Sequence, residues 1–226
     1  METLKPEISV VNRNGLQYIK KQGKLIQYNP WLGNHFGFIY DTMMKHEVFP
    51  KTFGGSIEKH YSILNRLLSD VHQQHVLELA TGTGSVIQFL ANDNQYTGVD
   101  VSPDLLKRAG KRLRSSGFTE TKLYIVSADD LPFQDQQFDL CLCILALNFF
   151  TTAEAVIKEV KRVLIPTGSF ICCVPIPERN RLNKMINGTL YPEKELRRLC
   201  QNYNLSMQSY PDENGPLLYF KAENHA

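Results

Sequence analysis

The sequence of 226 residues predicts a single α/β domain with a mostly parallel, doubly wound, seven-stranded sheet and helices on both faces. Short apolar runs of strand length alternate with amphipathic runs of helix length after residue 71, as in strand–helix–strand units. The alternation stops near the C-terminus, where residues 205–210 and 217–222 are joined by a link rich in Pro, Gly, Asp and Asn. Such a link predicts an antiparallel hairpin that closes the sheet.

The composition is that of an ordinary soluble globular protein, with 42% hydrophobic and 21% charged residues. A formal net charge of +2 gives no electrostatic reason to expect a nucleic-acid partner. No apolar run approaches the roughly 20 residues of a membrane span, and the first residues lack the pattern of a signal peptide. The five cysteines are odd in number and fall mostly in predicted strands, which favours free thiols and a cytoplasmic location.

Residues 1–70 are predicted to form an N-terminal arm or helical lid ahead of a cofactor-binding core at residues 71–226. Asn14-Gly15 is a hairpin-turn dipeptide between two extended pieces, so this region predicts either a small hairpin or a loose arm. An aromatic-rich segment, Trp31 to Met44, comes next. It precedes a helix over 57–68 that Ser56 caps and whose apolar side chains recur every three or four residues.

The core is predicted to begin with a strand at residues 76–79 that runs into a glycine turn and then a helix over 85–91. Because Gly82 and Gly84 lack a Cβ, the backbone can turn sharply there and lie against a ligand. The following helix would present free N–H groups at its N-terminus. Asp100 ends the next strand, where a carboxylate can accept hydrogen bonds from both ribose hydroxyls. This arrangement predicts a cofactor that contains a nucleoside.

The glycine spacing distinguishes between two such cofactors. A dinucleotide-binding loop has the form G-x-G-x-x-G, and its third glycine position is Ile87 in this chain. Glu78 stands before the glycines, where its charge would repel a pyrophosphate but tolerate the cationic amino-acid part of S-adenosylmethionine. The sequence therefore favours S-adenosylmethionine over NAD, and a nicotinamide-dependent oxidoreductase is the weaker alternative.

The remaining elements follow from caps and apolar runs. Ser102 and Pro103 start a helix to about residue 115, whose basic outer face we expect to be solvated. Thr152 caps a helix over 153–164. Further strands are expected at 122–127, 138–145 and 169–175, the last after a turn at 166–168, and a further helix at 192–202. The polar, irregular stretch 176–191 is expected to form part of the rim of the substrate site. The adjacent cysteines 172 and 173 would point to opposite faces of their strand, so no metal site is expected there.

Several of these stretches resemble the motifs of one known family. Glu78-x-Ala80-x-Gly82-x-Gly84 resembles motif I of the class I S-adenosylmethionine-dependent methyltransferases, with Ala80 in the first glycine position. Asp100 to Pro103 is similar to the second motif. Residues 127–139 and 159–168 resemble "D-A-E-x-L-P-F … F-D" and "E-x-x-R-V-L-K-P-G-G" of the branch that includes the ubiquinone/menaquinone biosynthesis methyltransferases. The resemblance covers about residues 74 to 175.

The resemblance implies a set of cofactor contacts. Glu78 and the loop Ala80, Thr81, Gly82 and Gly84 would approach the methionine part, Asp100 the ribose, Val101 the adenine face and Leu145 the sulfonium. The adenine edge would meet Ser127, Ala128 and Asp129. Ser127 replaces the family's usual Asp, so Ser127, Asp129 or the Ala128 N–H could hold the adenine, or the two aspartates at 129 and 130 could only shape the turn. Tyr40 belongs to a "Y-D-x-M" element that forms part of a helical lid in the branch, although a surface helix fits it equally well.

The implied activity is methyl transfer from S-adenosylmethionine to a small-molecule acceptor, for which quinone-ring carbon is one option. The N/D-P-P-Y/F element of the nucleobase amino-methyltransferases is absent from residues 145–150, which argues against methylation of DNA or RNA amines. An S-adenosylmethionine-binding module without catalysis is the second alternative. The acceptor atom and the oligomeric state are not predicted.

No catalytic base is identified from the sequence. Asn148 stands where the branch often has a His pair. If it points into the site it can hold a polar group but cannot act as a base at neutral pH, and otherwise it only starts a helix. Candidates for a base in the covering N-terminal segment are Tyr18, Tyr28, His35, Tyr40 and His46.

Overall fold

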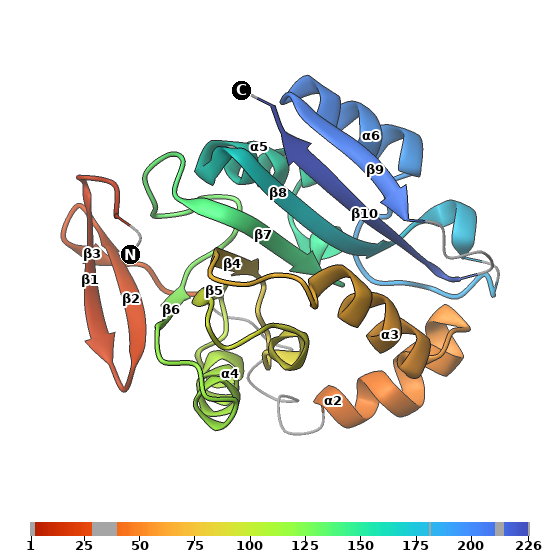
Figure 1. Ribbon diagram of the computed structural model, residues 1–226, viewed down its shortest axis with the longest axis horizontal. Coiled ribbons are helices and arrows are strands. Elements are labelled where there is room, and N and C mark those ends of the chain that lie inside the picture. The colour runs from red at the N-terminus through yellow and green to blue at the C-terminus, as the bar shows by residue number, and fades with distance from the viewer. Residues whose placement is uncertain (1–2, 29–39, 181, 211–214, 226) are drawn as a thin grey trace.

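The computed structural model describes residues 3–28, 40–180, 182–210 and 215–225 (Figure 1). One mixed sheet runs through the molecule in the order β1-β2-β6-β5-β4-β7-β8-β10-β9, and β3 pairs with β2. The strands are β1 Ile8–Arg13, β2 Leu16–Lys21, β3 Lys24–Leu25, β4 His75–Leu79, β5 Gln95–Asp100, β6 Thr121–Ile125, β7 Phe138–Ile144, β8 Leu164–Pro175, β9 Leu205–Tyr210 and β10 Leu217–Asn224.

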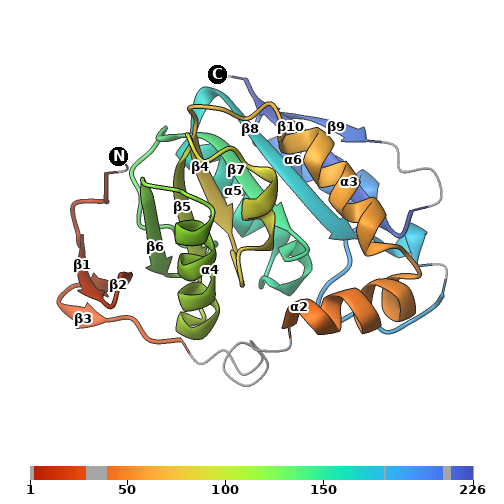
Figure 2. The same ribbon diagram turned by 60° about the horizontal axis from the view of Figure 1, so that its bottom comes forward.

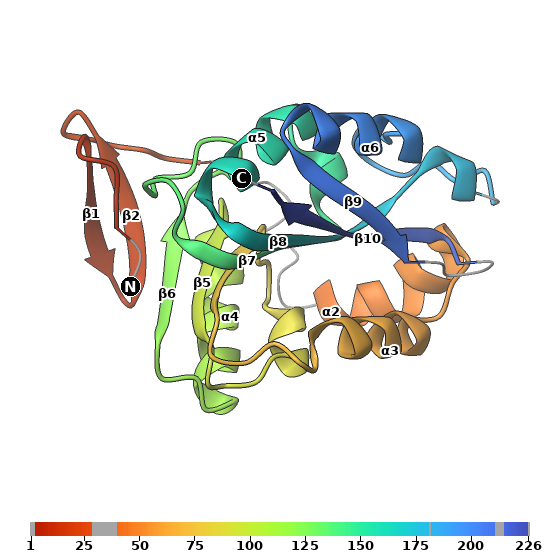
Figure 3. The same cartoon turned by 45° about the horizontal axis from the view of Figure 1, so that its top comes forward.

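Helical segments cover both faces of this sheet. They are α2 Tyr40–Met43, the π-helix η1 Met44–Phe53, α3 Ile57–Leu68, α4 Pro103–Ser115, α5 Ala153–Val163, α6 Glu193–Asn202, and short 3₁₀ segments at Ser85–Phe89 (η2), Leu147–Phe149 (η3) and Pro177–Arg179 (η4). Helices α3 and α4 lie on one face, and α5 and α6 lie on the other (Figure 3). No helix within the described ranges has the length and apolarity to cross a bilayer.

The predicted seven-stranded sheet is confirmed as β6-β5-β4-β7-β8-β10-β9. The first five of these strands pair in parallel, and β10 is antiparallel to both β8 and β9. Alternate residues of β4 face opposite layers: Val76 packs with the α4 side and Leu77 with the α5 side. The order reverses at β4, since β5 and β7 flank it, and ligands of open α/β sheets bind at the carboxyl ends of the strands beside such a point.

Of the two predicted forms of the N-terminal region, the structure has the hairpin. Asn14 and Gly15 take φ of 54° and 81°, which the tight turn between β1 and β2 requires. Strand β2 then pairs in parallel with β6 through Gln17 and Tyr18, so the hairpin extends the sheet beyond seven strands. The aromatic segment predicted from Trp31 lies outside the described residues as far as position 39.

Two elements differ from the sequence prediction. The helix expected over 85–91 is only the 3₁₀ segment Ser85–Phe89, because the glycine turn before it and the turn at 91–94 leave too few residues for an α-helix. The loop therefore lacks an α-helical N-terminus, which a pyrophosphate would need. Strand β8 begins at Leu164, and residues 166–168, predicted as a turn, lie within it where its register with β7 shifts.

Tight packing fixes the second glycine of the turn. A Cβ on Gly84 would lie 2.5 Å from Ile87 Cδ1 and 3.1 Å from Ala109 Cβ of α4. A Cβ on Gly82 would meet nothing closer than 3.9 Å. Both glycines have positive φ, so only Gly84 combines backbone strain with a steric requirement.

We expect Gly84→Ala to lower the free energy of unfolding by about 2–5 kcal/mol, since overpacking adds to left-handed strain. The matched control Gly82→Ala carries the strain alone and should cost about 1–2 kcal/mol. Urea unfolding of the reduced protein measures both. Equal losses for the two variants would contradict this account of Gly84.

Candidate functional site

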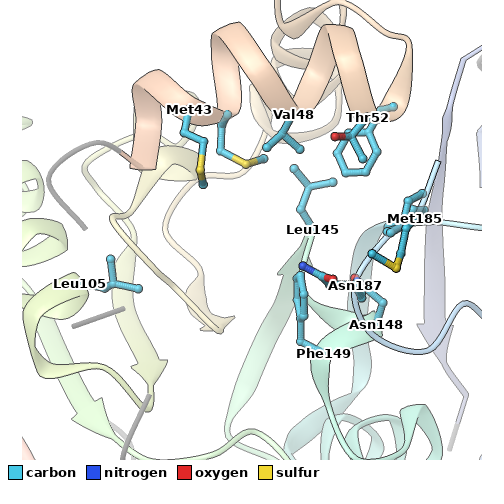
Figure 4. A pocket seen from close by; sticks show the side chains of 13 residues that line it. Met43, Val48, Thr52, Leu105, Leu145, Asn148, Phe149, Met185 and Asn187 are labelled. Carbon is cyan, nitrogen blue, oxygen red and sulfur yellow. The ribbon is translucent and has the colours of Figure 1, made fainter. Parts of the chain in front are cut away.

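A largely apolar cavity of about 290 Å³ lies at the carboxyl ends of the central strands (Figure 4). One wall is helical and consists of Met43, Met44, Val48, Thr52 and Phe53. The opposite wall follows β7 and β8 and includes Leu145, Asn148, Phe149 and residues 185–187. Figure 2 shows α2 on the side of the sheet at which β4 ends. A cavity of this size is at the lower end of the range for small-molecule sites.

The cavity wall carries no ionisable side chain among the residues that the structure describes. Its polar side chains are those of Thr52, Asn148 and Asn187. Across the described ranges, no three His, Cys, Asp or Glu side chains gather as metal ligands would. The wall can therefore hold and desolvate an apolar molecule, but it supplies no acid or base of its own.

Leu145 occupies a strained position in this wall. Its φ is 60°, a left-handed conformation that is uncommon for a residue other than glycine. The Leu145 N–H donates to the carbonyl of Cys173 at 2.7 Å, and this bond holds the residue at the end of β7. Its side chain points into the cavity (Figure 4). Among the predicted cofactor residues whose side chains the structure describes, Leu145 is thus the one that lines this cavity.

Asp100 joins the glycine turn to the end of β5. Its carboxylate accepts hydrogen bonds from the N–H of Gly82 and from the N–H of Ser102, both at 2.8 Å. Burial raises the pKa of the carboxyl, and these two N–H donors oppose the rise. Gly82 leaves open space where a Cβ would stand, so a ligand can approach the backbone beside the carboxylate. This geometry fits the ribose side of a nucleoside cofactor.

Glu78 lies deeper than a ligand-facing residue. It is 3% exposed, and its carboxyl accepts a hydrogen bond from the Tyr96 hydroxyl. Burial raises the pKa of Glu78 to about 8, while the Tyr96 hydrogen bond acts in the opposite direction. Thr81 turns its hydroxyl back to the Glu78 carbonyl at 3.0 Å. Contact of Glu78 with a cofactor therefore stays a prediction.

The segment expected at the adenine edge follows β6. Its first backbone N–H, that of Ser127, donates to the hydroxyl of Tyr28 at 3.2 Å. Ala128 is buried, and Asp129 is half-buried. Asp130 instead pairs with Lys21 of the N-terminal hairpin at 3.1 Å, so this carboxylate ties the hairpin to the core.

The candidate bases do not gather at the cavity. Tyr18 lies on β2, Tyr28 contacts Ser127, and His46 is exposed on the π-helix. None of these three lines the cavity. His35 and the side chain of Tyr40 lie outside the described residues. A base for the reaction stays unassigned.

Sequence reasoning did not single out His60. His60 is buried, its Nδ1 lies 2.8 Å from the Tyr219 hydroxyl, and burial lowers its pKa to about 4. It lines a smaller cavity of about 40 Å³ together with Ser85 and Leu145. The spacing of His60 from Ile57 on the apolar face of α3 could have indicated its burial. Residues 185–187 carry no motif, but they belong to the polar stretch 176–191 that the sequence predicts at the rim of the substrate site, and they line the cavity.

Comparisons with known proteins agree on one kind of chemistry. Residues 77–172 match the family described as "Methyltransferase domain". The demethylmenaquinone methyltransferase of Thermotoga maritima is 30% identical over 168 residues, which are 61% of this chain and 70% of that protein. The ubiquinone/menaquinone biosynthesis C-methyltransferase UbiE of Rickettsia felis is 27% identical over 161 residues, covering 61% and 65% of the two chains.

Solved structures extend the similarity to the fold. A putative O-methyltransferase from Nostoc punctiforme aligns with a TM-score of 0.67 at 18% identity and covers 88% of this chain and 63% of its own. The chain thus spans about two thirds of the length of each of these three proteins. At this level of identity the structural match supports the fold and not a particular activity.

The raised pKa of Glu78 makes the stability of the fold depend on pH. Between pH 4.5, the ordinary pKa of a glutamate, and about pH 8, the unfolded chain loses the Glu78 proton while the folded protein keeps it, so stability falls as pH rises. Glu78→Gln cannot ionise and still accepts from Tyr96. We expect this variant to be more stable than wild type at pH 9, by on the order of a few kcal/mol, with the difference vanishing near pH 4.5.

Urea midpoints measured from pH 4.5 to 9 test this expectation. Asp129→Asn, at a half-buried carboxyl in the loop after β6, is the control and should follow the wild-type curve. Parallel curves for wild type and Glu78→Gln would show that Glu78 ionises normally in the folded protein.

Proposed function

Because the chain belongs to the class I S-adenosylmethionine-dependent methyltransferases, we propose that it methylates a small, apolar acceptor held in the cavity beside Leu145. Its methyl donor is S-adenosylmethionine. The observation that carries the proposal is the cavity itself, which is apolar, lies at the carboxyl ends of the strands and shares Leu145 with the expected cofactor set.

Residues around the glycine turn would hold the cofactor. Bound S-adenosylmethionine supplies a methyl group that its positive sulfur already activates. The Asp100 carboxylate would accept from the ribose hydroxyls, and the open backbone at Gly82 would lie against the methionine part. The segment from Ser127 to Asp129 would meet the adenine edge, with Tyr28 beside it. Tyr40 would belong to the lid.

The cavity would contribute placement and desolvation. Its apolar wall excludes water and fixes the orientation of the acceptor toward the methyl group, and orientation of this kind can supply much of a rate enhancement. Because the described lining carries no ionisable group, the acceptor must bring a nucleophile that needs no base from this wall. An electron-rich aromatic carbon meets that condition: its π electrons form the new C–CH₃ bond as the S–CH₃ bond breaks, and the ring proton is lost to solvent afterwards.

Exposed apolar side chains at the cavity support an acceptor that reaches beyond it. Phe149 is 58% exposed and Met185 is 90% exposed, although both line the cavity. A ligand with an apolar extension would bury both. The names of the two quinone-pathway relatives suggest a quinol ring, and we propose that class as the acceptor.

The two alternative functions, a nicotinamide-dependent oxidoreductase and a non-catalytic binding module, have less support. The short 3₁₀ segment after the glycine turn is unsuited to a pyrophosphate, which disfavours a nicotinamide-dependent oxidoreductase. A binding module without catalysis would leave the apolar cavity without a role. All five cysteines are buried and form no disulfide, which supports a reducing compartment such as the cytoplasm.

Methyl transfer to reduced 2-substituted 1,4-naphthoquinones, with a ¹³C-labelled methyl donor and NMR of the product, tests the proposal. We expect label on a ring carbon, and no turnover with any member of the panel would contradict the quinol assignment.

Val48→Trp should fill the cavity and lower turnover at least tenfold while leaving S-adenosylhomocysteine affinity within about twofold. Val10→Trp, on exposed strand β1, is the matched control and should change neither.

The ribose assignment predicts a loss of affinity for Asp100→Asn. Loss of hydrogen bonds to a charged group costs about 1–3 kcal/mol, so S-adenosylhomocysteine should bind about 5- to 150-fold more weakly. Calorimetry with adenosine and 2′,3′-dideoxyadenosine, which lacks both ribose hydroxyls, is the control. Wild type should bind adenosine more tightly, and the variant should bind the two ligands with equal affinity. An unchanged preference would remove Asp100 from the ribose site.

A further inference from the structure

Asn148 carries an unpaired hydrogen-bond acceptor at the wall of the apolar cavity. The residue is 2% exposed, and its Oδ1 is a buried side-chain atom that finds no hydrogen-bond partner within the described part of the chain. Buried polar atoms in folded proteins are almost always paired, so this exception needs an explanation. In Figure 4 the side chains of Asn148 and Asn187 lie together beside Phe149, below Leu145.

The orientation of the amide is fixed by its other end. Asn148 Nδ2 donates to the main-chain carbonyl of Asn187 at 2.6 Å, and a carbonyl can pair only with the NH₂ end. A flipped amide would bring two oxygens together and leave the NH₂ without that partner. The unpaired atom is therefore a hydrogen-bond acceptor, and its missing partner must be a hydrogen-bond donor.

The backbone around Asn148 is also held. Its carbonyl accepts from the N–H of Thr189 at 2.8 Å. Gly188 lies so close that a Cβ there would stand 2.0 Å from this carbonyl oxygen. Contacts with residues 187–189 thus fix both the main chain and the side chain of Asn148. These contacts hold the side chain in the orientation that leaves Oδ1 unpaired.

The cavity is where a donor can come from. Asn148 follows Leu145 by three residues and lines the same cavity, whose wall is otherwise mostly apolar. The neighbouring lining residues Phe149 and Met185 are largely exposed, so few packing contacts oppose their displacement by a ligand that reaches the amide. An apolar pocket with one unpaired polar atom recognises an apolar ligand that carries one matching polar group.

We propose that Asn148 is a positioning residue whose Oδ1 accepts a hydrogen bond from a hydroxyl group of the acceptor. The proposal rests on the function proposed above and assigns the residue that binds one hydroxyl of the acceptor. An ether or a carbonyl offers no donor and would leave Oδ1 buried and unpaired, and a site of this kind strongly rejects the analogue that lacks the hydrogen bond.

Calorimetry with a matched ligand pair tests the proposal without turnover. The probes are 1-naphthol and 1-methoxynaphthalene, titrated into the full chain with saturating S-adenosylhomocysteine. Wild type should bind 1-naphthol about tenfold more tightly. Asn148→Ala and the near-isosteric Asn148→Leu should each reduce that preference to less than twofold, and using both keeps the test available if one variant fails to fold.

Asn187→Ala is the matched control. This side chain also lines the cavity, but the carbonyl that holds Asn148 belongs to the main chain and survives the substitution. The preference for 1-naphthol should therefore persist in this variant. A preference lost in Asn187→Ala but kept in both Asn148 variants would assign the recognition to Asn187 and overturn the proposal.

The outcomes separate this inference from the proposed function. Equal binding of the two probes by wild type would overturn the role of Asn148 and leave the apolar acceptor site intact. Binding of neither probe, together with no methyl transfer to the reduced naphthoquinones, would overturn both. A further readout is kinetic: Asn148→Leu should raise KM for a hydroxyl-bearing acceptor more than it lowers kcat, while S-adenosylhomocysteine affinity stays within twofold.

Discussion

The close approach of the glycine turn to helix α4 is the constraint on which the rest of the site depends. Gly84 lies against Ala109 with no room for a side chain, so the chain can follow this route out of β4 only with glycine at this position. That route brings the N–H of Gly82 to the carboxylate of Asp100 and joins the ends of two neighbouring parallel strands. The proposed nucleoside site is thus a product of backbone packing, to which the individual side chains add.

The site divides its chemistry between two sides. The side toward β4 and β5 is polar. There the Gly82 N–H donates to the buried Asp100 carboxylate, an arrangement that suits a cofactor, and the Glu78 carboxyl is buried as well. Toward β7, β8 and the π-helix the described wall is apolar. Leu145, strained at the end of β7, belongs to the apolar side and borders the cofactor side. A reaction that joins a cationic donor to an apolar acceptor needs such a division, because each partner requires a different solvent environment.

Local patterns predicted the strands and most helices of the core, but few of the residues that line the cavity. The strands, the glycine turn and the place of Asp100 at the end of β5 follow from period and spacing, because neighbours in sequence make them. The pairing of Glu78 with Tyr96 and the wall at Met185 depend on contacts between distant segments, which no local pattern encodes. The helix after the glycine turn was mispredicted because its apolar residues suit either a 3₁₀ segment or an α-helix, and chain length decided between them.

The parallel pairing of β2 with β6 has a consequence for the solubility of the molecule. Without it, β6 would be an open edge with unpaired N–H and C=O groups, which can recruit another chain into the sheet and start aggregation. The hairpin moves that edge outward to β1, a short strand whose register ends at Arg13. The same arm carries Tyr28 to the backbone of Ser127. Protection of the sheet and completion of the proposed adenine side are therefore coupled, so fraying of the arm would expose the edge and open the proposed site together.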